Sequence, residues 1–290
     1  MGEAATPAKW GGDGPIMSKV ESYYDGDAER EWRRLERHRT EFAVTMRALT
    51  EYLPDPPAKV LDIGGGPGRY AIALAGRGHR VTLLDLSANL LALARVKSAE
   101  AHVTLGGYVH GNALDLTAFE RESFDAVLLM GPLYHLLTPG DRRRALRQAA
   151  RVLRPGGLLF ASFISLYAPF RDVAKFEPEW LVEHSDEAAK LLKSGSLPVP
   201  EGFTDAHFTH PSQIRPLIRG AGFSVLDLIG CEGVVSMIEE KVNEAIGEVW
   251  EAWVDLNYRL GKDPSVHGAA EHLLAVARKP RARKPAKGKK

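Results

Sequence analysis

The chain of 290 residues has a single cysteine, Cys231, and no long hydrophobic run. One cysteine excludes an internal disulfide framework and any zinc site built from several cysteines. No apolar stretch approaches the roughly 20 residues that a membrane-spanning helix requires. Residues 1–20 also lack the uninterrupted apolar centre of a secretory signal peptide. These absences lead us to expect a cytoplasmic protein that does not engage a membrane.

Acidic and basic residues nearly balance, with a formal net charge of +1, but they are unevenly distributed. Residues 278–290 carry eight lysines or arginines and no acid, so the rest of the chain holds 30 basic against 37 acidic side chains. An end this rich in proline, lysine and alanine buries too little apolar surface to fold. We therefore expect disorder over 1–20 and 279–290, the latter as a solubilising tail or as a weak, salt-sensitive contact with nucleic acid.

Between these ends, apolar patterns predict one helix followed by alternating strands and helices. Apolar residues at three- and four-residue spacings from Trp32 to Leu49 indicate an amphipathic helix over about 25–53 that Pro54 ends. Near-continuous apolar stretches then indicate strands buried on both faces. The predicted strands are 59–63, 80–86, 107–111, 124–130, 157–164, 223–230 and 272–278. The predicted helices are 67–76, 87–99 with Ser87 as N-cap, 139–153, 178–193, 211–221 and 234–260.

This order predicts an α/β fold with a doubly wound, mostly parallel seven-stranded sheet over residues 21–278. Residues 21–57 form a helical cap in this interpretation. Residues 166–208 contain six aromatic side chains, which makes them too apolar for a disordered loop and too long for a simple connection. We expect this insertion to lie over the carboxyl edge of the sheet as a lid.

The segment VLDIGGGPGRYAIALA, residues 60–75, places a glycine-rich turn after the first predicted strand. In an open parallel sheet this turn faces the ligand crevice. The pattern D-x-G-x-G-x-G is formed by Asp62, Gly64, Gly66 and Gly68. A dinucleotide fingerprint fails when counted from Gly64, because Arg69 holds its last position, but its G-x-G-x-x-A variant fits up to Ala71. No lysine followed by serine or threonine closes the turn, so a P-loop is excluded while nucleoside and dinucleotide stay open.

Three features beyond the turn favour the nucleoside. Asp62 places a carboxylate where a positively charged amino-acid portion is welcome and a pyrophosphate is not. Asp85 ends the second strand, 23 residues later, where a carboxylate accepts both hydroxyls of a ribose. Asn112 follows the third strand beside a candidate adenine edge, and the segment LRPGGLLF, residues 153–160, leads tightly into the fifth strand.

As a set, these features resemble the class I S-adenosylmethionine-dependent methyltransferases over roughly residues 58–165 and the last two strands. The resemblance implies a Rossmann-like fold, S-adenosylmethionine as cofactor and S-adenosylhomocysteine as product. It implies a floor of glycines, with Asp62 facing the methionyl amine through water and Asp85 holding the ribose. The cofactor-binding residues so implied are Tyr23, Asp62, Gly64, Gly66, Gly68, Asp85, Leu86 against the adenine, Asn112, Ala113 and Met130. Asn112 has an alternative role as the cap of the following turn.

The segment MGPLYHLL, residues 130–137, bears on what is methylated. Relatives that methylate the exocyclic amine of a nucleic-acid base carry Asn, Asp or Ser where this chain has Gly131, which has no side-chain oxygen. The segment is closer to small-molecule enzymes, including a group of poorly characterised bacterial ones with a GPLYHL pattern. The catalytic candidates are His135, as a proton acceptor near neutral pH, and Tyr134. Tyr23 and Tyr24 are expected beside the sulfonium, whose charge an aromatic face stabilises.

We therefore predict methyl transfer to a nitrogen, oxygen or sulfur atom of a small molecule. The alternatives are an RNA or protein methyltransferase aided by the basic tail, a nicotinamide-dependent oxidoreductase and a non-catalytic nucleotide-binding module. His207 and His210 are spaced H-x-x-H but have no carboxylate or cysteine partner nearby, so we predict no metal. Weaker candidates for the acceptor pocket are Arg34, Glu41, Glu183, His184 and His272.

Overall fold

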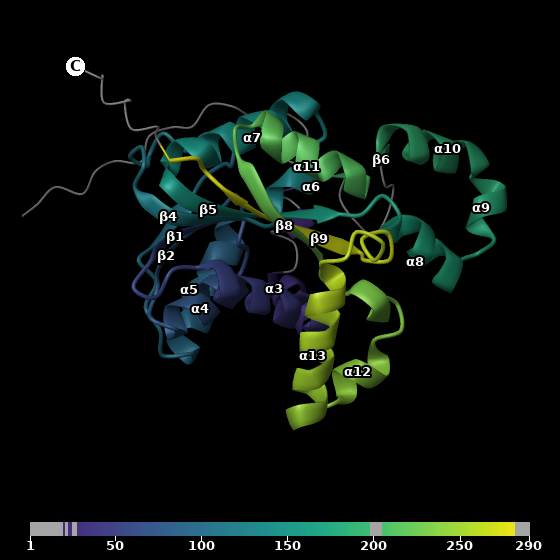
Figure 1. Ribbon diagram of the computed structural model, residues 1–290, viewed down its shortest axis with the longest axis horizontal. Helices are drawn as coiled ribbons and strands as arrows, with labels where there is room; N and C mark the ends of the chain where they lie inside the picture. The colour runs from purple at the N-terminus through teal and green to yellow at the C-terminus, as the bar shows by residue number, and fades with distance from the viewer. Residues whose placement is uncertain (1–19, 21–22, 25–27, 198–204, 282–290) are drawn as a thin grey trace, which may run out of the picture.

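A computed structural model describes residues 20, 23–24, 28–197 and 205–281 and shows one twisted sheet between helical layers (Figure 1). The seven strands lie in the order β3-β2-β1-β4-β5-β9-β8. Their bounds are β1 (Lys59–Ile63), β2 (Arg80–Asp85), β3 (Gly107–His110), β4 (Phe124–Leu129), β5 (Leu153–Ile164), β8 (Ser224–Gly230) and β9 (His272–Arg278). Strands β1 to β5 pair in parallel, whereas β9 is antiparallel to both β5 and β8. The predicted doubly wound, mostly parallel α/β fold is confirmed.

Each face of the sheet has its own apolar core. Successive side chains of a strand point to opposite faces, so Val60 packs in one core while Leu61 and Ile63 pack in the other. The first core is covered by α3 (Arg39–Tyr52), α4 (Arg69–Gly76), α5 (Ala88–Glu100) and α13 (Gly247–Gly261). The second is covered by α7 (Pro139–Val152) and α11 (Pro211–Gly220). The Ser87 hydroxyl accepts a hydrogen bond from the Leu90 N–H, which confirms the predicted N-cap of α5.

The N-terminal cap differs from the single predicted helix. It consists of α2 (Ala28–Arg37) and α3, and His38 between them has φ −92° and ψ 55°, outside the helical range. Residues 1–19 and 282–290 lie outside the described residues. The predicted disorder does not extend to Val20, which is buried in a helical turn, or to Lys279, which donates to the Leu153 carbonyl.

The predicted lid is a small helical region beside the sheet (Figure 1). It contains α8 (Ala168–Phe176), α9 (Trp180–Glu183) and α10 (Ser185–Ser194), followed by the antiparallel strands β6 (Ser196–Leu197) and β7 (Ala206–His207). The prediction of one helix over 178–193 is wrong, because the chain leaves the helical conformation at His184. Residues 198–204 lie outside the described residues, so the lid role stays a prediction.

The prediction of one helix over 234–260 is also wrong. The segment forms η1 (Gly233–Val235), α12 (Glu240–Glu244) and α13. Arg39 donates to the carbonyls of Asn243 and Ala245 and stacks on the Trp250 ring, which holds the chain in a bend. This bend gives α12 and α13 separate directions.

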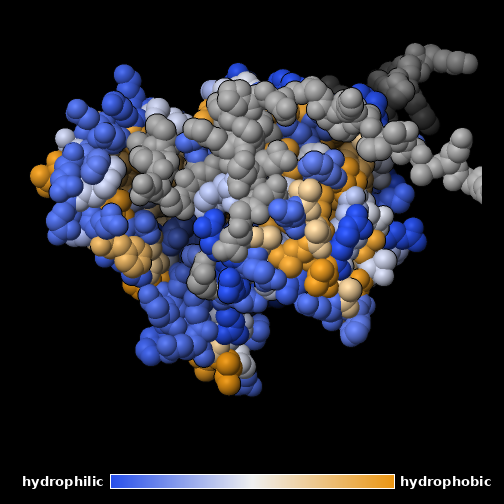
Figure 2. Space-filling model, turned by 180° about the vertical axis from the view of Figure 1, so that it is seen from behind, coloured by the Kyte–Doolittle hydropathy of each residue, from blue (hydrophilic) through white to orange (hydrophobic). Residues whose placement is uncertain are grey.

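The tip formed by α12 and α13 exposes apolar side chains (Figure 2). Ile246 and Val249 are 78% and 60% exposed there. Within the described part of the chain, no helix has both the length and the apolar character needed to cross a bilayer.

The packing of α13 on β8 yields a stability prediction. A Cβ on Gly261 would lie 2.4 Å from the Gly230 carbonyl oxygen, so Gly261→Ala forces the helix away from the strand. We expect the free energy of unfolding to fall by about 1–3 kcal/mol, as for other overpacked cores. The matched control is Gly220→Ala at the end of α11, where an added Cβ meets nothing within 4 Å. Urea denaturation of both variants checks this, and equal stability of Gly261→Ala and wild type would contradict it.

Candidate functional site

A cavity opens at the carboxyl edge of the sheet, beyond β1, β2, β3 and β4. Its empty space, with the open mouth included, is about 1030 Å³. The wall comes from residues 64–67, 85–87, 111–113, 130–132 and 134–136, which follow these four strands. The cap adds Val20, Tyr24, Glu31 and Arg34.

The turn after β1 brings bare backbone against the cavity. Gly66 has φ +55°, a left-handed conformation that glycine adopts without strain. Its N–H then donates to Oδ2 of Asp85 at 2.7 Å. Gly65 packs against Asp62, because an added Cβ would lie 2.4 Å from Asp62 Oδ2. The turn is therefore shaped by two aspartates at the ends of adjacent strands.

Asp62 is the residue that most strongly indicates a ligand. Its side chain is 1% exposed, and neither carboxylate oxygen has a hydrogen-bond partner among the described residues. Burial, and then the charge of Asp85, raise the pKa of Asp62 to about 7. A buried carboxylate without a partner is costly, and a cationic ligand group removes that cost.

Asp85 is buried but partly satisfied. Its Oδ2 accepts the Gly66 N–H, and its Oδ1 accepts the Ser87 N–H at 2.8 Å. Burial raises the pKa of Asp85 to about 6, although these backbone hydrogen bonds act in the opposite direction. Each oxygen keeps a second lone pair, so the carboxylate is able to accept hydroxyl groups from the cavity.

The predicted adenine end of the cavity is also lined as expected. Leu86, Asn112 and Ala113 all contribute to the wall. The Asn112 amide oxygen accepts the Leu114 N–H at 2.9 Å, so it caps the following turn, as the alternative proposed. Asn112 therefore both lines the cavity and holds the following turn in place through its side chain.

An aromatic group forms the opposite end of the cavity. The Tyr24 hydroxyl lies 2.8 Å from Nε2 of His135, and the Tyr134 and His135 rings pack edge to face at 4.7 Å. Burial lowers the pKa of His135 to about 4, although a hydrogen bond to the Asp205 backbone opposes this shift. Burial also raises the pKa of Tyr24 well above its usual value. At neutral pH the pair is therefore a neutral imidazole and a protonated phenol. The expectation that His135 titrates near neutral pH is wrong, because burial moves its pKa well below that range.

The cavity gathers most of the predicted site residues. Those that line it are Asp62, Gly64, Gly66, Asp85, Leu86, Asn112, Ala113, Met130, Tyr134 and His135. Two are corrected. Of the two tyrosines expected there, Tyr24 lines the cavity and Tyr23 does not, and the Tyr23 ring meets Tyr24 edge to face at 5.2 Å. Gly68 is not in the wall, because it starts α4 and faces Leu83 and Ala94 of the core.

The weaker candidates separate into two groups. Arg34 lines the cavity, with Glu41 and His272 directly behind it. Glu183 and His184 belong to the helical region of α9 and do not line the cavity. The wall also includes Glu31, Gly65, Pro67 and Arg69, which sequence reasoning missed. Glu31 and Arg34 lie one helical turn apart on α2 and form an ion pair. Their three-residue spacing in the sequence was therefore a signal that Glu31 accompanies Arg34.

His207 and His210, for which no metal is predicted, have hydrogen-bond partners within the chain. His207 Nδ1 bonds the Ser196 hydroxyl, and His210 Nε2 bonds the Tyr167 hydroxyl. Among the residues that the structure describes, one group has a metal-like composition, namely Glu41, Glu232 and His272.

Comparison with known proteins points to methyltransferases. A family model described as a methyltransferase domain matches residues 60–157. The ubiquinone biosynthesis O-methyltransferase of Xanthomonas axonopodis pv. citri (strain 306) is 32% identical over 187 residues, covering 64% of this chain and 71% of that protein. The enzyme of that name from Xanthomonas campestris pv. campestris (strain B100) is 34% identical, and the chain spans just under two thirds (66%) of its length.

A solved structure shares the fold. The SAM-dependent methyltransferase of Methanosarcina mazei superposes with a TM-score of 0.56 at 20% identity, covering 81% of this chain and 98% of that one. Sequence analysis left two ligands open for the glycine-rich turn. These matches favour S-adenosylmethionine over a nicotinamide dinucleotide.

The orphan carboxylate predicts a pH dependence of ligand binding. Only ionised Asp62 pairs with an ammonium, and its pKa is about 7. We therefore expect S-adenosylhomocysteine to bind about tenfold more weakly at pH 6 than at pH 8, with the dependence lost in Asp62→Asn. Isothermal titration across this range provides the measurement, and an equal slope in both proteins would refute the assignment.

The same shift controls the stability of the unliganded protein. Because the folded-state pKa is raised from 3.8 to about 7, ionisation of Asp62 lowers the free energy of unfolding as pH rises through that interval. Asp62→Asn should therefore melt at a higher temperature than wild type at pH 8, which separates weakened binding from misfolding.

Proposed function

The chain belongs to the class I S-adenosylmethionine-dependent methyltransferases, and we propose that it methylates a hydroxyl oxygen of a small molecule held beside His135. The observation that carries the proposal is the hydrogen-bonded pair of Tyr24 and His135 in the wall that also contains Asp62 and Asp85. A proton acceptor and a cofactor site thereby share one cavity.

The cofactor is held by the strand ends of the first half of the sheet. In this proposal Asp62 pairs with the amine of the methionyl portion, and Asp85 accepts the ribose hydroxyls. Gly64, Gly66 and Leu86 offer backbone and apolar surface, while Asn112 and Ala113 border the base. The support is the burial of both carboxylates and the missing partner of Asp62.

The protein's chemical task is to remove a proton from the acceptor and to exclude water. When bound, S-adenosylmethionine supplies a methyl group already activated by a sulfonium sulfur. A hydroxyl is a weak nucleophile until its proton leaves, whereas a thiolate needs no base. Burial lowers the pKa of His135 to about 4, so the imidazole is unprotonated at neutral pH and has room for that proton, but it is a weaker base than an exposed histidine. The Tyr24 hydroxyl lies 2.8 Å from its Nε2 and in this proposal carries the proton from the acceptor to the ring. Tyr134 is proposed to pack against the acceptor.

Two further observations support a small oxygen acceptor. The two relatives described above are named as O-methyltransferases of ubiquinone biosynthesis. The cap residues Tyr24, Glu31 and Arg34 close over the cavity, which limits the size of an acceptor. Residues 21–57 and 166–208 serve as cap and lid in this proposal.

A nucleic-acid base is a poorer acceptor here. An added Cβ on Gly131 would lie 3.0 Å from the Gly64 carbonyl oxygen, so the turn is packed against the place where base-methylating relatives carry a polar side chain. Gly131 therefore lacks both the group and the room to bind an exocyclic amine.

Substitution of the pair tests the proposed chemistry. We expect His135→Ala and Tyr24→Phe to lower kcat by about 100-fold, the usual worth of a positioned acid–base group. The affinity for S-adenosylhomocysteine should change less than threefold in both. The assay follows S-adenosylhomocysteine formation with a panel of phenols, catechols, amines and thiols. Tyr23→Phe is the matched control, because its ring touches Tyr24 and does not line the cavity.

Two outcomes would contradict the proposal. A thiol or amine as the preferred acceptor overturns the choice of oxygen. Equal losses of kcat and of cofactor affinity in His135→Ala assign that residue a structural role.

Deletion of the basic tail distinguishes a small-molecule acceptor from an RNA or protein acceptor. Removal of residues 282–290, which lie beyond the last hydrogen-bonded tail residues, should change turnover of a small phenol less than twofold. Loss of activity on RNA or protein, with none on small molecules before the deletion, would favour the macromolecular acceptor. The comparison measures the transfer of labelled methyl groups to RNA or to protein that is retained on a filter.

A further inference from the structure

Arg34 reaches the cavity through a guanidinium that two carboxylates hold. Its Nε lies 3.0 Å from Glu31 Oε1, and its Nη1 donates to Glu41 Oε2 at 3.0 Å. Glu41 comes from α3 and is 6% exposed. Burial alone would lower the pKa of Arg34, but Glu41 and then Glu31 raise it above the usual value. The side chain is therefore charged and has little freedom to move.

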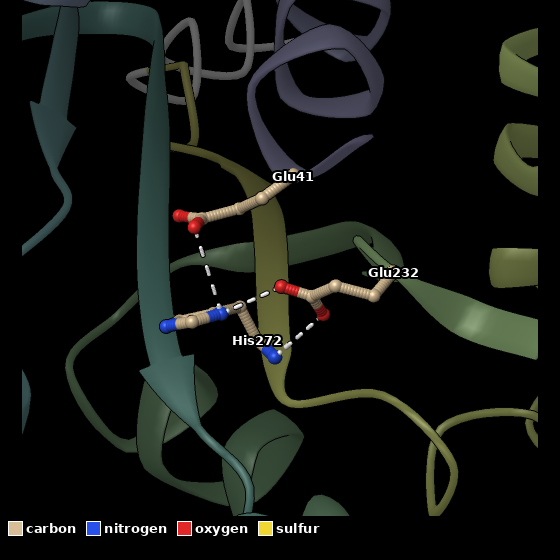
Figure 3. Close-up of side chains that lie close together, drawn as sticks. All are labelled: Glu41, Glu232 and His272. Atoms are coloured by element: carbon tan, nitrogen blue, oxygen red, sulfur yellow. Dashed lines mark hydrogen bonds and ion pairs between the residues drawn. The ribbon is translucent and has the colours of Figure 1, made fainter. Parts of the chain in front are cut away.

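Glu41 is in turn held by residues that arrive from the far end of the chain (Figure 3). His272, at the start of β9, lies 3.7 Å from Glu41 Oε2 through its Nδ1. The same Nδ1 donates to Glu232 Oε1 at 2.6 Å. Glu232 is fully buried, and its Oε2 accepts the N–H groups of Glu271 and His272. The result is a continuous line from Arg34 through Glu41 and His272 to Glu232.

The charges of this line are balanced by a proton on His272. Burial alone would lower the pKa of His272, but Glu41 and Glu232 raise it to about 9, so an imidazolium lies between the two carboxylates at neutral pH. These three side chains have the composition of a metal site, but the His272 Nδ1 proton already occupies the space between them. A metal ion would have to displace that hydrogen bond.

We propose that Glu41, His272 and Glu232 form a buried positioning network that fixes Arg34 as the anchor for the carboxylate of S-adenosylmethionine. The inference rests on the cofactor-holding part of the proposed function. Asp62 supplies the negative partner for the amine. Glu31 and Glu41 take the Nε donor and one Nη1 donor of Arg34, so the N–H groups that remain on Nη1 and Nη2 are those that a carboxylate can use. The three network residues do not line the cavity, so their effect on the ligand passes through Arg34.

Two ligands that differ in the amino-acid portion make the test. S-adenosylhomocysteine carries the carboxylate, whereas 5′-methylthioadenosine keeps the nucleoside and lacks the amino acid. We expect Glu41→Gln to weaken S-adenosylhomocysteine binding about tenfold or more, the usual worth of a hydrogen bond to a charged group. Binding of 5′-methylthioadenosine should change less than twofold. Titration calorimetry measures both, and a thermal melt reports folding.

A double-mutant cycle tests whether the effect passes through Arg34. If it does, Arg34→Gln weakens S-adenosylhomocysteine binding by a similar factor, and adding Glu41→Gln causes no further loss. His272→Gln is the second variant and keeps the proposal testable if Glu41→Gln does not fold. Glu100→Gln is the matched control, because Glu100 forms only an exposed ion pair with Lys97.

Three results would overturn the inference. The first is an equal loss for both ligands in a folded Glu41→Gln protein. The second is additive loss in the double variant. The third is loss of S-adenosylhomocysteine binding on treatment with a chelator, which would make the cluster a metal site. If the wild-type protein binds neither ligand, the proposed cofactor site itself is wrong, and the inference falls with it. The binding test does not depend on the acceptor, so a failure to methylate hydroxyl compounds contradicts only the proposed acceptor.

Discussion

Two buried carboxylates at the ends of adjacent parallel strands dominate the chemistry of this protein. The register that pairs Asp62 with Leu83 places the ends of β1 and β2 side by side, so Asp62 and Asp85 face one cavity. Backbone N–H groups satisfy Asp85, whereas the described residues leave Asp62 without a hydrogen bond. The fold therefore keeps a negative charge that a ligand has to balance. Glycine is required in the turn because the two carboxylates pack directly against its backbone, where a side chain would collide with Asp62 at Gly65.

The N-terminal cap places a positive charge, that of Arg34, in the wall of the same cavity. Arg34 is balanced by Glu31 and Glu41, and Glu41 is balanced by protonated His272. In the proposed site, a zwitterionic amino-acid portion would meet Asp62, which has no hydrogen-bond partner among the described residues, and Arg34, which two carboxylates hold. Charge of both signs is placed within one wall, and the two signs come from different parts of the chain.

Sequence reasoning succeeded where local pattern decides the structure. The strands of the sheet, the N-cap Ser87 and the wall residues Asp62, Asp85 and His135 follow from alternation, turn chemistry and position at strand ends. It failed where distant contacts decide. Arg39 from the cap bends the chain after α12, which no helical pattern reveals.

The same limit applies to the details of the site. Sequence alone does not show which of two adjacent tyrosines faces the cavity, so both Tyr23 and Tyr24 were expected there, whereas only Tyr24 lines it among the residues described. Glu232 was not considered, since its partner His272 is 40 residues away and reaches it only through the antiparallel pairing of β8 and β9. A role set by tertiary contact leaves no signal in the local sequence.

The antiparallel β9 has a consequence for how the protein is made. Ribosomes release β1 to β5, with both aspartates and the glycine turn, more than 100 residues before His272 emerges. A nascent chain that ends before residue 272 lacks the imidazolium that lies between Glu41 and Glu232. The contacts that hold Glu41 therefore form only after β9 has been made and has paired with β5 and β8.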